Sequence, residues 1–469
     1  MIERSCFPNA FPAKLKVAVL DMTHAGIIIA RKLAELGFDV NAVDIYNTVD
    51  DGVLFSLKQE LNIRVSKKPI PVDSFDLIVS PVHLDPGYRM LADAGSQGKK
   101  VISHHLAVGM ILAAGRALED VKTIEVTGSK GKTSTASILA DMLSRSMVVA
   151  LHTTRGLELW NAGKIRILHL GLSIAPGSIL HAVDILGSMD IRPDCCIFEV
   201  SIGGTGYGDI GVITTLEPDY AIAGSTSRAS DAKLRMLDHV KDGSVFFLNS
   251  RDSRSVIKAR DLGRDLFTFT DLGLHELKAD LRLAFNGKSV TVSMNGMDLA
   301  ADLDPSYNAS SYTLAFAAAG AVAFHMGISR EVIAEVITGF TGLQGRMQEK
   351  SVNGRILIDN SNSGMDIRSA ELALDYGLAA VAGRKAGKVL MVLGEEAAQV
   401  CEGLPPEKVA EFVGKRIGDV DHLILVGERM KNIRHEEISH ALHLEDGLER
   451  AMGMSETGDL VLSCVKCFR

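Results

Sequence analysis

The chain has 469 residues, of which 46% are hydrophobic and 23% charged, a composition typical of a globular protein with two or three domains. Its 50 basic and 58 acidic side chains give a net charge of −8, which excludes a general nucleic-acid binder that relies on a positive surface. No segment reaches the roughly 18–20 uninterrupted apolar residues of a membrane span, and the longest candidate, 314–328, predicts a buried helix. The N-terminus lacks a signal-peptide pattern and the six cysteines do not suggest a disulfide framework, so we expect a cytoplasmic protein.

The first 118 residues predict one α/β domain. An apolar strand over 16–21, a helix over 25–37 and a strand over 40–45 follow one another as in a βαβ unit. The turn Asp21-Met-Thr-His-Ala-Gly26 keeps only the last glycine of the pattern G-x-G-x-x-G, so its backbone cannot approach a pyrophosphate closely. We therefore interpret this turn as structural rather than as a dinucleotide site.

The segment 119–342 predicts a second α/β domain, and 343–469 a third. In the second, buried strands give way to alternating runs over 278–285 and 288–294, which are followed by Asn-Gly turns and indicate a small antiparallel meander. In the third, four apolar strands alternate with helical segments, which predicts a parallel sheet covered by helices on both faces. The expected strands of the third domain are 355–359, 388–393, 422–426 and 459–462.

The clearest chemical signal is a glycine-rich loop between a strand over 123–127 and a helix. Its backbone N–H groups and the helix N-terminus are suited to bind phosphate. Lys132 is placed to reach the terminal phosphates, and Thr133 to offer its hydroxyl to Mg²⁺. The spacing G-x-x-G-K-T is two residues shorter than the common phosphate loop, and the alternative is a lysine-bearing helix cap. The predicted loop consists of Gly128, Ser129, Lys130, Gly131, Lys132, Thr133 and Ser134.

Glu199 ends the buried strand 195–200. A buried carboxylate is costly unless it meets a cation, and an acid on a neighbouring strand holds Mg²⁺ in phosphate-loop proteins. The alternative is a salt bridge at the sheet edge. The glycine-rich segment 203–208 that follows predicts either a mobile stretch lying close to a ligand or a plain flexible connection.

Together these residues resemble the Mur ligase family. The loop 128–134 is similar to the family's G-T-x-G-K-T-[ST], and Glu199-Val-Ser201 to its E-x-S, whose glutamate binds Mg²⁺. Further landmarks follow in the family's order along nearly the whole chain: Leu248-Asn-Ser-Arg-Asp252, Asn308, Gly345-Arg-Met347, Asp359 and Gly458-Asp459. The resemblance implies an ATP-dependent ligase with an N-terminal Rossmann-like substrate domain, a central ATPase and a C-terminal Rossmann-like domain.

The resemblance also implies roles for single residues. Lys132, Glu199 and Arg346 would be catalytic, because they would neutralise charge on the phosphoryl group that passes from ATP to a substrate carboxylate. Asn308, Arg346 and Asp359 would contribute to the nucleotide site. Lys233 would be the carbamylated lysine that holds a second Mg²⁺, although an exposed helical lysine is an alternative.

Three departures from the family pattern are informative. The family's D-H pair is Asp219-Tyr220, its H-N pair is Tyr307-Asn308, and its D-D-Y-A-H-N-P segment reads 359–365 with neither histidine nor proline. The nucleotide-binding motifs are thus retained, while the positions that would hold an amino acid or a UDP-sugar have changed.

One branch of the family, the archaeal coenzyme F-430 synthetases, resembles this combination in segments 199–208, 358–364 and 463–469. The implied substrate is a nickel-containing seco-tetrapyrrole acid whose activated propionate is attacked by a ring carbon. Two alternatives remain: an amide-forming Mur ligase, and a nucleotide-binding regulator without activity. Arg155, Lys164, Arg166 and Arg228 are candidate contacts for a polyanionic substrate.

Other reactive side chains are interpreted as structural. His104 and His105 are expected at a strand end, facing opposite ways. His435, His440 and His443 are expected on a solvated helix face, and Cys464-x-x-Cys467 is expected to hold no metal.

Overall fold

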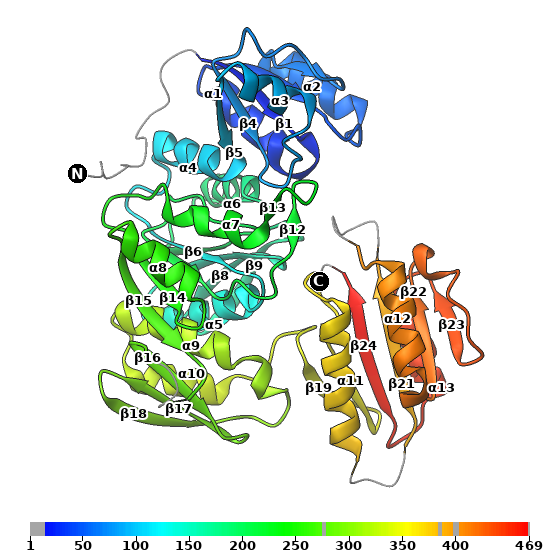
Figure 1. Ribbon diagram of the computed structural model, residues 1–469. Coiled ribbons are helices and arrows are strands. Elements are labelled where there is room, and N and C mark those ends of the chain that lie inside the picture. Colours follow the sequence, from blue (N-terminus) through cyan, green and yellow to red (C-terminus); the bar gives the residue numbers. More distant parts are fainter. Residues whose placement is uncertain (1–14, 274–277, 383–386, 397–402, 468–469) are drawn as a thin grey trace. The chain divides into compact units, whose positions relative to one another are not determined.

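The structure, a computed structural model, describes residues 15–273, 278–382, 387–396 and 403–467. The chain forms two compact units. One contains the described residues to 285 together with 291–300 and 313–336, and the other contains 286–290, 301–312 and the residues from 337. Three larger sheets follow one another along the sequence, each within one of the predicted domains (Figure 1). The domain boundaries at residues 118 and 342 themselves stay predictions.

The first sheet is entirely parallel, in the order β3-β2-β1-β4-β5. Its central strand β1 has four of its five side chains buried because the sheet is covered by helices on both faces. The predicted helix over 25–37 is real but begins earlier, as a single π-helical turn over Met22–Gly26 that continues into α1. The elements are β1 (Lys16–Leu20), α1 (Ile27–Glu35), β2 (Asp39–Val43), α2 (Asp51–Leu61), β3 (Arg64–Ser66), β4 (Leu77–Ser80), α3 (Arg89–Ser96), β5 (Lys100–Ser103) and α4 (His104–Gly115).

The expected strand end at His104 and His105 is wrong, because both residues begin helix α4. The Ser103 hydroxyl accepts a hydrogen bond from the Leu106 amide at 3.1 Å and so caps the helix at its first turn. Both histidines are buried.

The central sheet has the order β18-β17-β16-β15-β14-β11-β6-β10-β7-β8-β9. The predicted meander is present as the consecutive strands β16 to β18, and it extends the central sheet through the pairing of β15 with β16 instead of forming a separate layer. The strands are β6 (Lys122–Thr127), β7 (Val149–Thr153), β8 (Gly156–Asn161), β9 (Lys164–Leu170), β10 (Cys195–Glu199), β11 (Ile210–Ile213), β14 (Val245–Asn249), β15 (Asp265–Thr270), β16 (Leu281–Phe285), β17 (Ser289–Met294) and β18 (Met297–Asp302).

Helices and one small hairpin complete this region. The predicted buried helix is α9, whose side chains are almost all buried. Helix α6 packs against α1 and α4, so that the first sheet and the central sheet share one hydrophobic core that includes Ile29, Ile111 and Ile179. The elements are α5 (Lys132–Ser144), α6 (Gly177–Ser188), β12 (Ala221–Ile222), β13 (Ser227–Arg228), α7 (Ala229–Leu234), α8 (Ser253–Asp261), α9 (Thr313–His325) and α10 (Arg330–Gly339).

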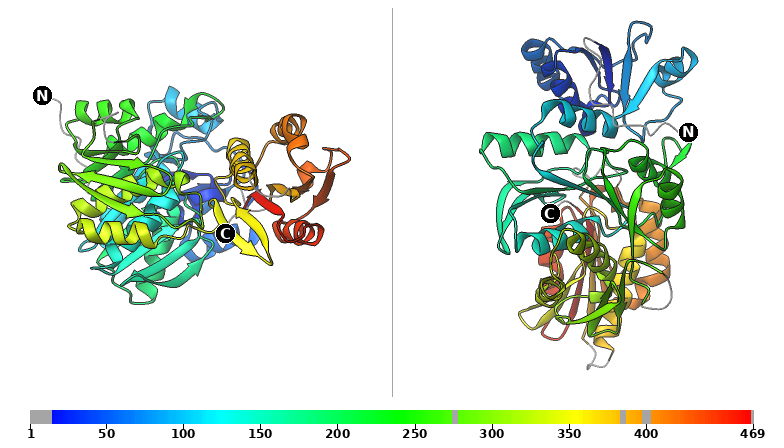
Figure 2. Two further views of the ribbon diagram at one scale, coloured as in Figure 1. Left: turned by 90° about the horizontal axis from the view of Figure 1, so that it is seen from below. Right: turned by 90° about the vertical axis from the view of Figure 1, so that its left-hand side faces the viewer.

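The third sheet has the order β19-β20-β24-β21-β22-β23, with only the β19–β20 hairpin antiparallel. In the left view of Figure 2, α11 and α12 lie on one face and α13 on the other, as predicted for a covered parallel sheet. The elements are β19 (Gln348–Val352), β20 (Arg355–Asp359), α11 (Ile367–Val381), β21 (Val389–Glu395), α12 (Pro406–Arg416), β22 (His422–Val426), β23 (Ile438–Ala441), α13 (Leu444–Met454) and β24 (Leu460–Lys466).

Two further expectations concern this sheet. The helix face predicted for His435, His440 and His443 is wrong, because His440 lies on the edge strand β23 and the residues around it form a loop. Cys464 and Cys467 belong to hydrophobic clusters on different sides of the sheet, in agreement with a structural role. Among the described residues, no helix is long and apolar enough to cross a membrane.

Candidate active site

The glycine-rich loop connects β6 to α5 with the geometry of a phosphate loop. Gly128 and Gly131 have φ angles of 146° and 80°, which side-chain-bearing residues rarely adopt. A Cβ atom on Gly128 would lie 2.0 Å from the Thr214 hydroxyl oxygen, so this position requires glycine for space as well as for conformation. The alternative of a simple lysine-bearing helix cap does not account for these two constraints.

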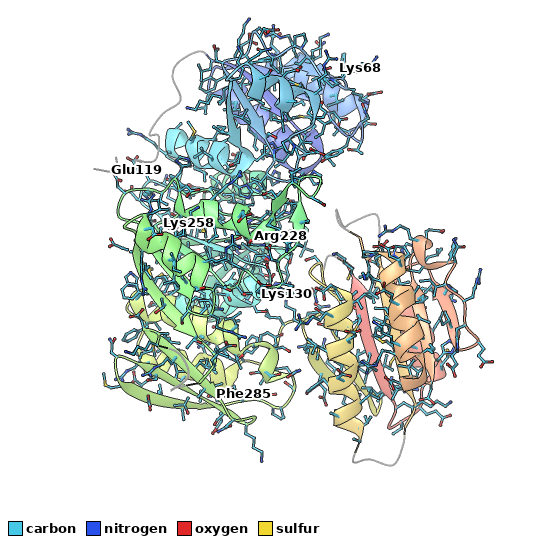
Figure 3. The ribbon with its side chains drawn as sticks, in the orientation of Figure 1. Lys68, Glu119, Lys130, Arg228, Lys258 and Phe285 are labelled. Atoms are coloured by element: carbon cyan, nitrogen blue, oxygen red, sulfur yellow. The ribbon has the colours of Figure 1, made fainter. Side chains whose placement is uncertain are left out.

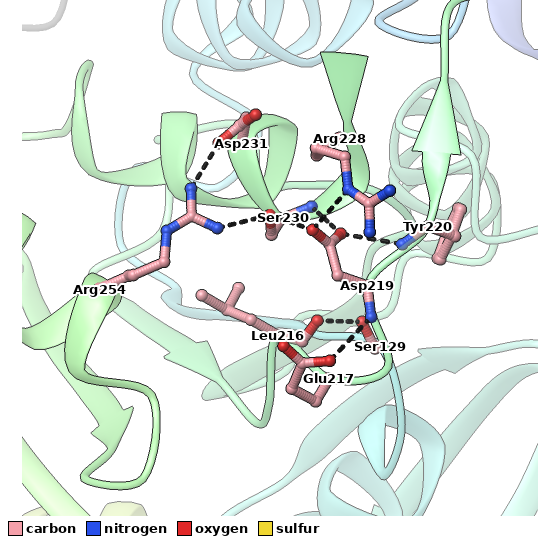
Figure 4. Close-up of polar contacts among 9 residues, drawn as sticks. All are labelled: Ser129, Leu216, Glu217, Asp219, Tyr220, Arg228, Ser230, Asp231 and Arg254. Carbon is pink, nitrogen blue, oxygen red and sulfur yellow. Dashed lines mark hydrogen bonds and ion pairs between the residues drawn. The ribbon is translucent and has the colours of Figure 1, made fainter. Parts of the chain in front are cut away.

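The end of the neighbouring strand β11 holds the loop in place. The Ser129 amide donates to the Thr215 carbonyl at 2.7 Å, and the Thr214 hydroxyl donates to the Lys130 carbonyl at 2.6 Å. The Ser129 hydroxyl donates to the Leu216 carbonyl at 3.0 Å (Figure 4). Lys130, which Figure 3 labels, lies between the two glycines of the loop in the sequence. The loop backbone is therefore fixed by several hydrogen bonds before any nucleotide binds.

The family landmark at 248–252 supports the same strand end from behind. The Asn249 side-chain amide donates to the Thr214 carbonyl at 2.9 Å, and the Asp252 carboxylate accepts from the Leu216 amide at 2.9 Å. This landmark thus positions the residues that brace the phosphate loop.

Thr133 and Glu199 form the second part of the site. The Thr133 hydroxyl lies 2.8 Å from each carboxylate oxygen of Glu199, which is 2% exposed. A hydroxyl and a carboxylate in contact are the hard oxygen donors that suit Mg²⁺. The edge salt bridge considered for Glu199 is wrong, because β10 lies inside the sheet between β6 and β7. Lys132 is on the same turn, and its amino group donates to the Gly128 carbonyl at 3.1 Å.

Lys233 lies on α7 and is 1% exposed, so the alternative of an exposed helical lysine is wrong. Its amino group lies 4.9 Å from the ring centroid of Tyr220, the residue that replaces the family's histidine. A cation over an aromatic ring is an attractive contact, so the tyrosine offers Lys233 an electrostatic partner where a histidine would offer a nitrogen ligand.

Asp219 organises the turn beside Lys233 (Figure 4). It accepts hydrogen bonds from the Ser230 amide at 2.9 Å, from the Ser230 hydroxyl at 2.8 Å and from the Arg228 guanidinium at 3.0 Å. Burial alone would raise its pKa, but the hydrogen bonds from Ser230 and Arg228 outweigh burial and lower the pKa of Asp219 to about 2. Asp219 is therefore an ionised anchor of the β12–β13 hairpin.

The basic residues named as contacts for a polyanionic substrate divide into two groups. Arg228 is paired with Asp219, and Arg155 lies 3.0 Å from the Glu158 carboxylate. Lys164 and Arg166 lie on the exposed edge strand β9. Two of the four cations thus neutralise neighbouring carboxylates of the protein.

Asn308, Arg346 and Asp359 belong to the second compact unit, where they surround one turn. The Asn308 amide donates to the Met347 carbonyl at 3.0 Å, and the Asn362 side chain donates to the Gly345 carbonyl at 2.7 Å. A Cβ atom on Gly345, whose φ is 71°, would lie 2.0 Å from the Ser361 carbonyl oxygen. The segment around Arg346 is thus held between Asn308 and the segment that begins at Asp359.

One structural residue was missed by the sequence analysis. Glu125, in the middle of β6, is 2% exposed and accepts hydrogen bonds from the Thr205 amide at 2.8 Å and from the Gly206 amide at 3.3 Å, as well as from the Thr205 hydroxyl. Burial raises its pKa. The mobile stretch considered for 203–208 is therefore wrong, since the segment is tied to the core. A charged residue inside an apolar strand was the available signal.

A cavity of about 550 Å³ lies between the first sheet and the central region. Its lining includes Lys100 and His105 from one side and Arg235 and His239 from the other. His105 donates from Nε2 to the Ser201 carbonyl at 2.8 Å, and burial lowers its pKa to about 4, so its ring is neutral near pH 7. This cavity has the size of a small-molecule site, and Gly204 and Thr205, which follow Glu199 in the sequence, belong to its lining.

Comparison with known proteins agrees with this geometry. Residues 126–319 match the Mur ligase middle domain, and residues 349–467 match the C-terminal domain of coenzyme F430 synthetase CfbE. A coenzyme F(430) synthetase of Methanosarcina acetivorans is 50% identical over 466 residues, covering 97% of this chain and 99% of the relative. A second one, from Methanocaldococcus jannaschii, is 26% identical and covers 88% of this chain and 91% of its own length.

Solved structures show the same fold. A MurF ligase from Thermotoga maritima in complex with ADP has a TM-score of 0.56 at 16% identity, and the match covers 90% of both chains. The predicted fold class is thus confirmed.

The chain belongs to the Mur ligase family of ATP-dependent ligases. Its sequence is similar to both coenzyme F(430) synthetases along most of its length, as the sequence analysis predicted.

Proposed function

We propose that this ligase closes a carbocyclic ring in a nickel-containing seco-tetrapyrrole acid and so forms coenzyme F430, with release of ADP and phosphate. The observation that carries the proposal is the 50% identity to a coenzyme F(430) synthetase over 97% of the chain. The residues agree with it, because the phosphate loop and Glu199 are retained while the segment 359–365 lacks the histidine and proline of amide-forming relatives.

The reaction begins with activation of a carboxylate. A substrate propionate oxygen attacks the γ-phosphorus of ATP, the bond to the β-phosphate oxygen breaks, and an acyl phosphate and ADP result. Amides of the loop around Gly128 and Gly131 bind the phosphates, and the Lys132 ammonium lies on the same turn to balance the charge that develops on the transferring group. Lys132 is thereby assigned to catalysis.

Thr133 and Glu199 would hold Mg²⁺, since together they present a hydroxyl and an ionisable carboxylate within 2.8 Å of each other. When bound there, Mg²⁺ supplies positive charge to the nucleotide phosphates. We assign Lys233 to a second cation: CO₂ adds to its uncharged amine with loss of a proton, and the resulting carbamate would replace the positive charge that lies over the Tyr220 ring. We assign Arg346, Asn308 and Asp359 to the nucleotide.

The second step forms a carbon–carbon bond. A ring carbon loses a proton to a base and attacks the acyl carbon. The single bond between the acyl carbon and the phosphate oxygen then breaks, phosphate leaves with the electron pair, and a cyclic ketone remains. Because nucleophile and electrophile belong to one molecule, correct orientation lowers the barrier by up to roughly 7–11 kcal/mol. The neutral imidazole of His105, the Arg235 guanidinium and the His239 side chain in the cavity would orient a polyanionic substrate, whose negative charges an acidic protein must otherwise repel.

The test is ADP release from purified protein with Mg-ATP and the nickel seco-tetrapyrrole acid as the only added substrate. We expect release without any amine and a product lighter by one water. Release that requires an added amine or amino acid would instead place the chain among amide-forming ligases, and binding of ATP without turnover would indicate a regulator.

A further inference from the structure

The turn between β1 and α1 contains a carboxylate that the ligase reaction does not use. Asp21 is fully buried and has a φ of 68°, a conformation that non-glycine residues seldom adopt. One of its carboxylate oxygens accepts from the Thr23 amide at 3.0 Å. The other lies 2.7 Å from Nδ1 of His24 and 3.6 Å from Nε2 of His83. A strained backbone thus directs one carboxylate oxygen toward two imidazoles.

His83 approaches Asp21 from a different part of the chain. It lies in the loop after β4, and its ring meets that of His24 edge to face, with 5.0 Å between the ring centroids. Its Nε2 atom is buried and makes no hydrogen bond. Its contact with the Asp21 carboxylate, at 3.6 Å, is too long for a good hydrogen bond, so a ligand bound to this nitrogen would stabilise the arrangement.

The spacing of the donors suits a transition-metal ion. Metal–nitrogen and metal–oxygen bonds of about 2.0–2.2 Å place adjacent donors roughly 3–3.5 Å apart. The ligand atoms of Asp21, His24 and His83 lie within 4.8 Å of one another, and the two shorter separations are 2.7 and 3.6 Å. Two imidazoles and one carboxylate form a donor set that suits late first-row divalent ions, whereas Mg²⁺ and Ca²⁺ prefer sets made of oxygen atoms alone.

The position of the cluster connects it to the ligase site. Val82, beside His83, packs against a small apolar cluster of the central region that contains Ala229, and Ile202 packs against the same cluster. Ile202 follows the Glu199–Ser201 segment by one residue. A short path of packed residues therefore connects the loop of His83 to the segment that follows Glu199.

We propose that Asp21, His24 and His83 form a binding site for a late first-row divalent metal centre with open coordination positions. Such a centre has two possible sources, a hydrated ion such as Ni²⁺ or Zn²⁺ and the nickel of the tetrapyrrole substrate, and the second source rests on the proposed function. In either case the metal accepts lone pairs from the two imidazoles and the carboxylate, with no change in oxidation state.

The first experiment measures binding of Ni²⁺ and Zn²⁺ to the untagged full chain by calorimetry. We expect one equivalent to bind, and His83→Gln and His24→Gln to weaken binding by at least about tenfold. The control is His169→Ala, which removes one member of the other close histidine pair, His169 and His181, whose ring centroids are 5.7 Å apart. Unfolding midpoints of all variants in urea identify any that fail to fold, and Asp21→Asn provides a second variant that keeps the side-chain shape.

The second experiment follows the absorption bands of the nickel seco-tetrapyrrole acid and of its metal-free form on titration with protein. A band shift that needs nickel and is lost in His83→Gln would assign the site to the substrate's metal, even if free ions do not bind. Binding of free ions without such a shift would assign the site to a separate metal ion. That assignment would hold even if the ligase activity proved to be different from the one proposed. Wild-type protein that shows neither effect, or folded variants that match it in both, would overturn the proposal.

Discussion

The turns after β1 and β6 occupy equivalent positions, each after an interior strand that pairs in parallel with both of its neighbours, yet the two turns suit opposite charges. Each follows an interior strand and leads into a helix, and each begins with a residue of positive φ, Asp21 at 68° and Gly128 at 146°. In the β6 turn, glycines leave the helix N-terminus accessible to an anion. In the β1 turn, the Asp21 carboxylate itself accepts a hydrogen bond from the Thr23 amide, so the protein supplies the anion. The imidazole of His24 contacts the other oxygen of this carboxylate.

In these two turns the sheet topology determines where a ligand would bind, and the first residue of the turn determines whether that ligand would be an anion or a cation. A carboxylate that already occupies the helix N-terminus repels phosphate, which adds a second argument, beside the missing glycines, against a dinucleotide at the β1 turn.

The largest effect that would test this contrast is expected at Lys132. Lys132→Ala removes the ammonium group at the start of helix α5. We expect the rate of ADP release to fall by roughly 10³-fold, in line with the loss of one group that stabilises transition-state charge. Steady-state ADP release measures the effect. Lys408→Ala, in an exposed ion pair on α12, is the control and should leave the rate unchanged. Equal rates for both variants would remove the β6 turn from the reaction.

Glu199→Gln should change the dependence on metal. The amide can still accept from Thr133 but carries no charge, so the Mg²⁺ concentration for half-maximal turnover should rise by at least about tenfold. Titration of MgCl₂ at saturating ATP measures this shift. If Glu199→Gln lowered the maximal rate without changing the Mg²⁺ requirement, Glu199 would not hold the ion.

Gly128→Ala tests the space at the start of the β6 turn. The new methyl group would meet the Thr214 hydroxyl, and the backbone would be strained, so we expect the free energy of unfolding to fall by roughly 1–3 kcal/mol. Gly243→Ala is the matched control, because Gly243 also has a positive φ of 75° but open space around its Cβ position. Urea denaturation of both variants separates steric conflict from backbone strain, and an equal loss in both would show that Thr214 yields easily.

The last expected effect, which is absent near neutral pH and grows only on acidification, is a dependence of stability on pH at His152, on β7. Burial lowers its pKa to about 4, and its Nε2 donates to the Ser173 carbonyl at 2.9 Å. Between pH 6.5 and 4 the unfolded chain therefore binds a proton at His152 that the folded chain does not bind. The contribution of His152 to the free energy of unfolding is complete above pH 6.5, and it declines on acidification by up to about 1.4 kcal/mol per pH unit. His152→Gln should make the unfolding free energy less sensitive to pH across this interval, and an unchanged slope would contradict the assignment.

The β6 turn could be predicted from sequence because its chemistry is local. Strand, glycines, lysine and helix follow within about a dozen residues, and Glu199 was identifiable as a carboxylate that ends an apolar strand. The Asp21 cluster could not be predicted, since three strands and two helices separate His83 from His24 in the sequence and nothing in the segment of His83 marks it. The start of α4 at His104 was obscured because an apolar strand runs directly into an apolar helix, and only the cap at Ser103 separates them.

The hydrogen bonds that Glu125 accepts from Thr205 and Gly206 affect the entropy cost of substrate binding. A free glycine-rich segment would lose conformational entropy on meeting a ligand, at a cost of roughly 1–2 kcal/mol for each residue that becomes ordered. Here the buried carboxylate immobilises residues 205 and 206 when the chain folds. The wall beside the cavity is therefore rigid before the substrate arrives, and more of the contact energy remains available as affinity.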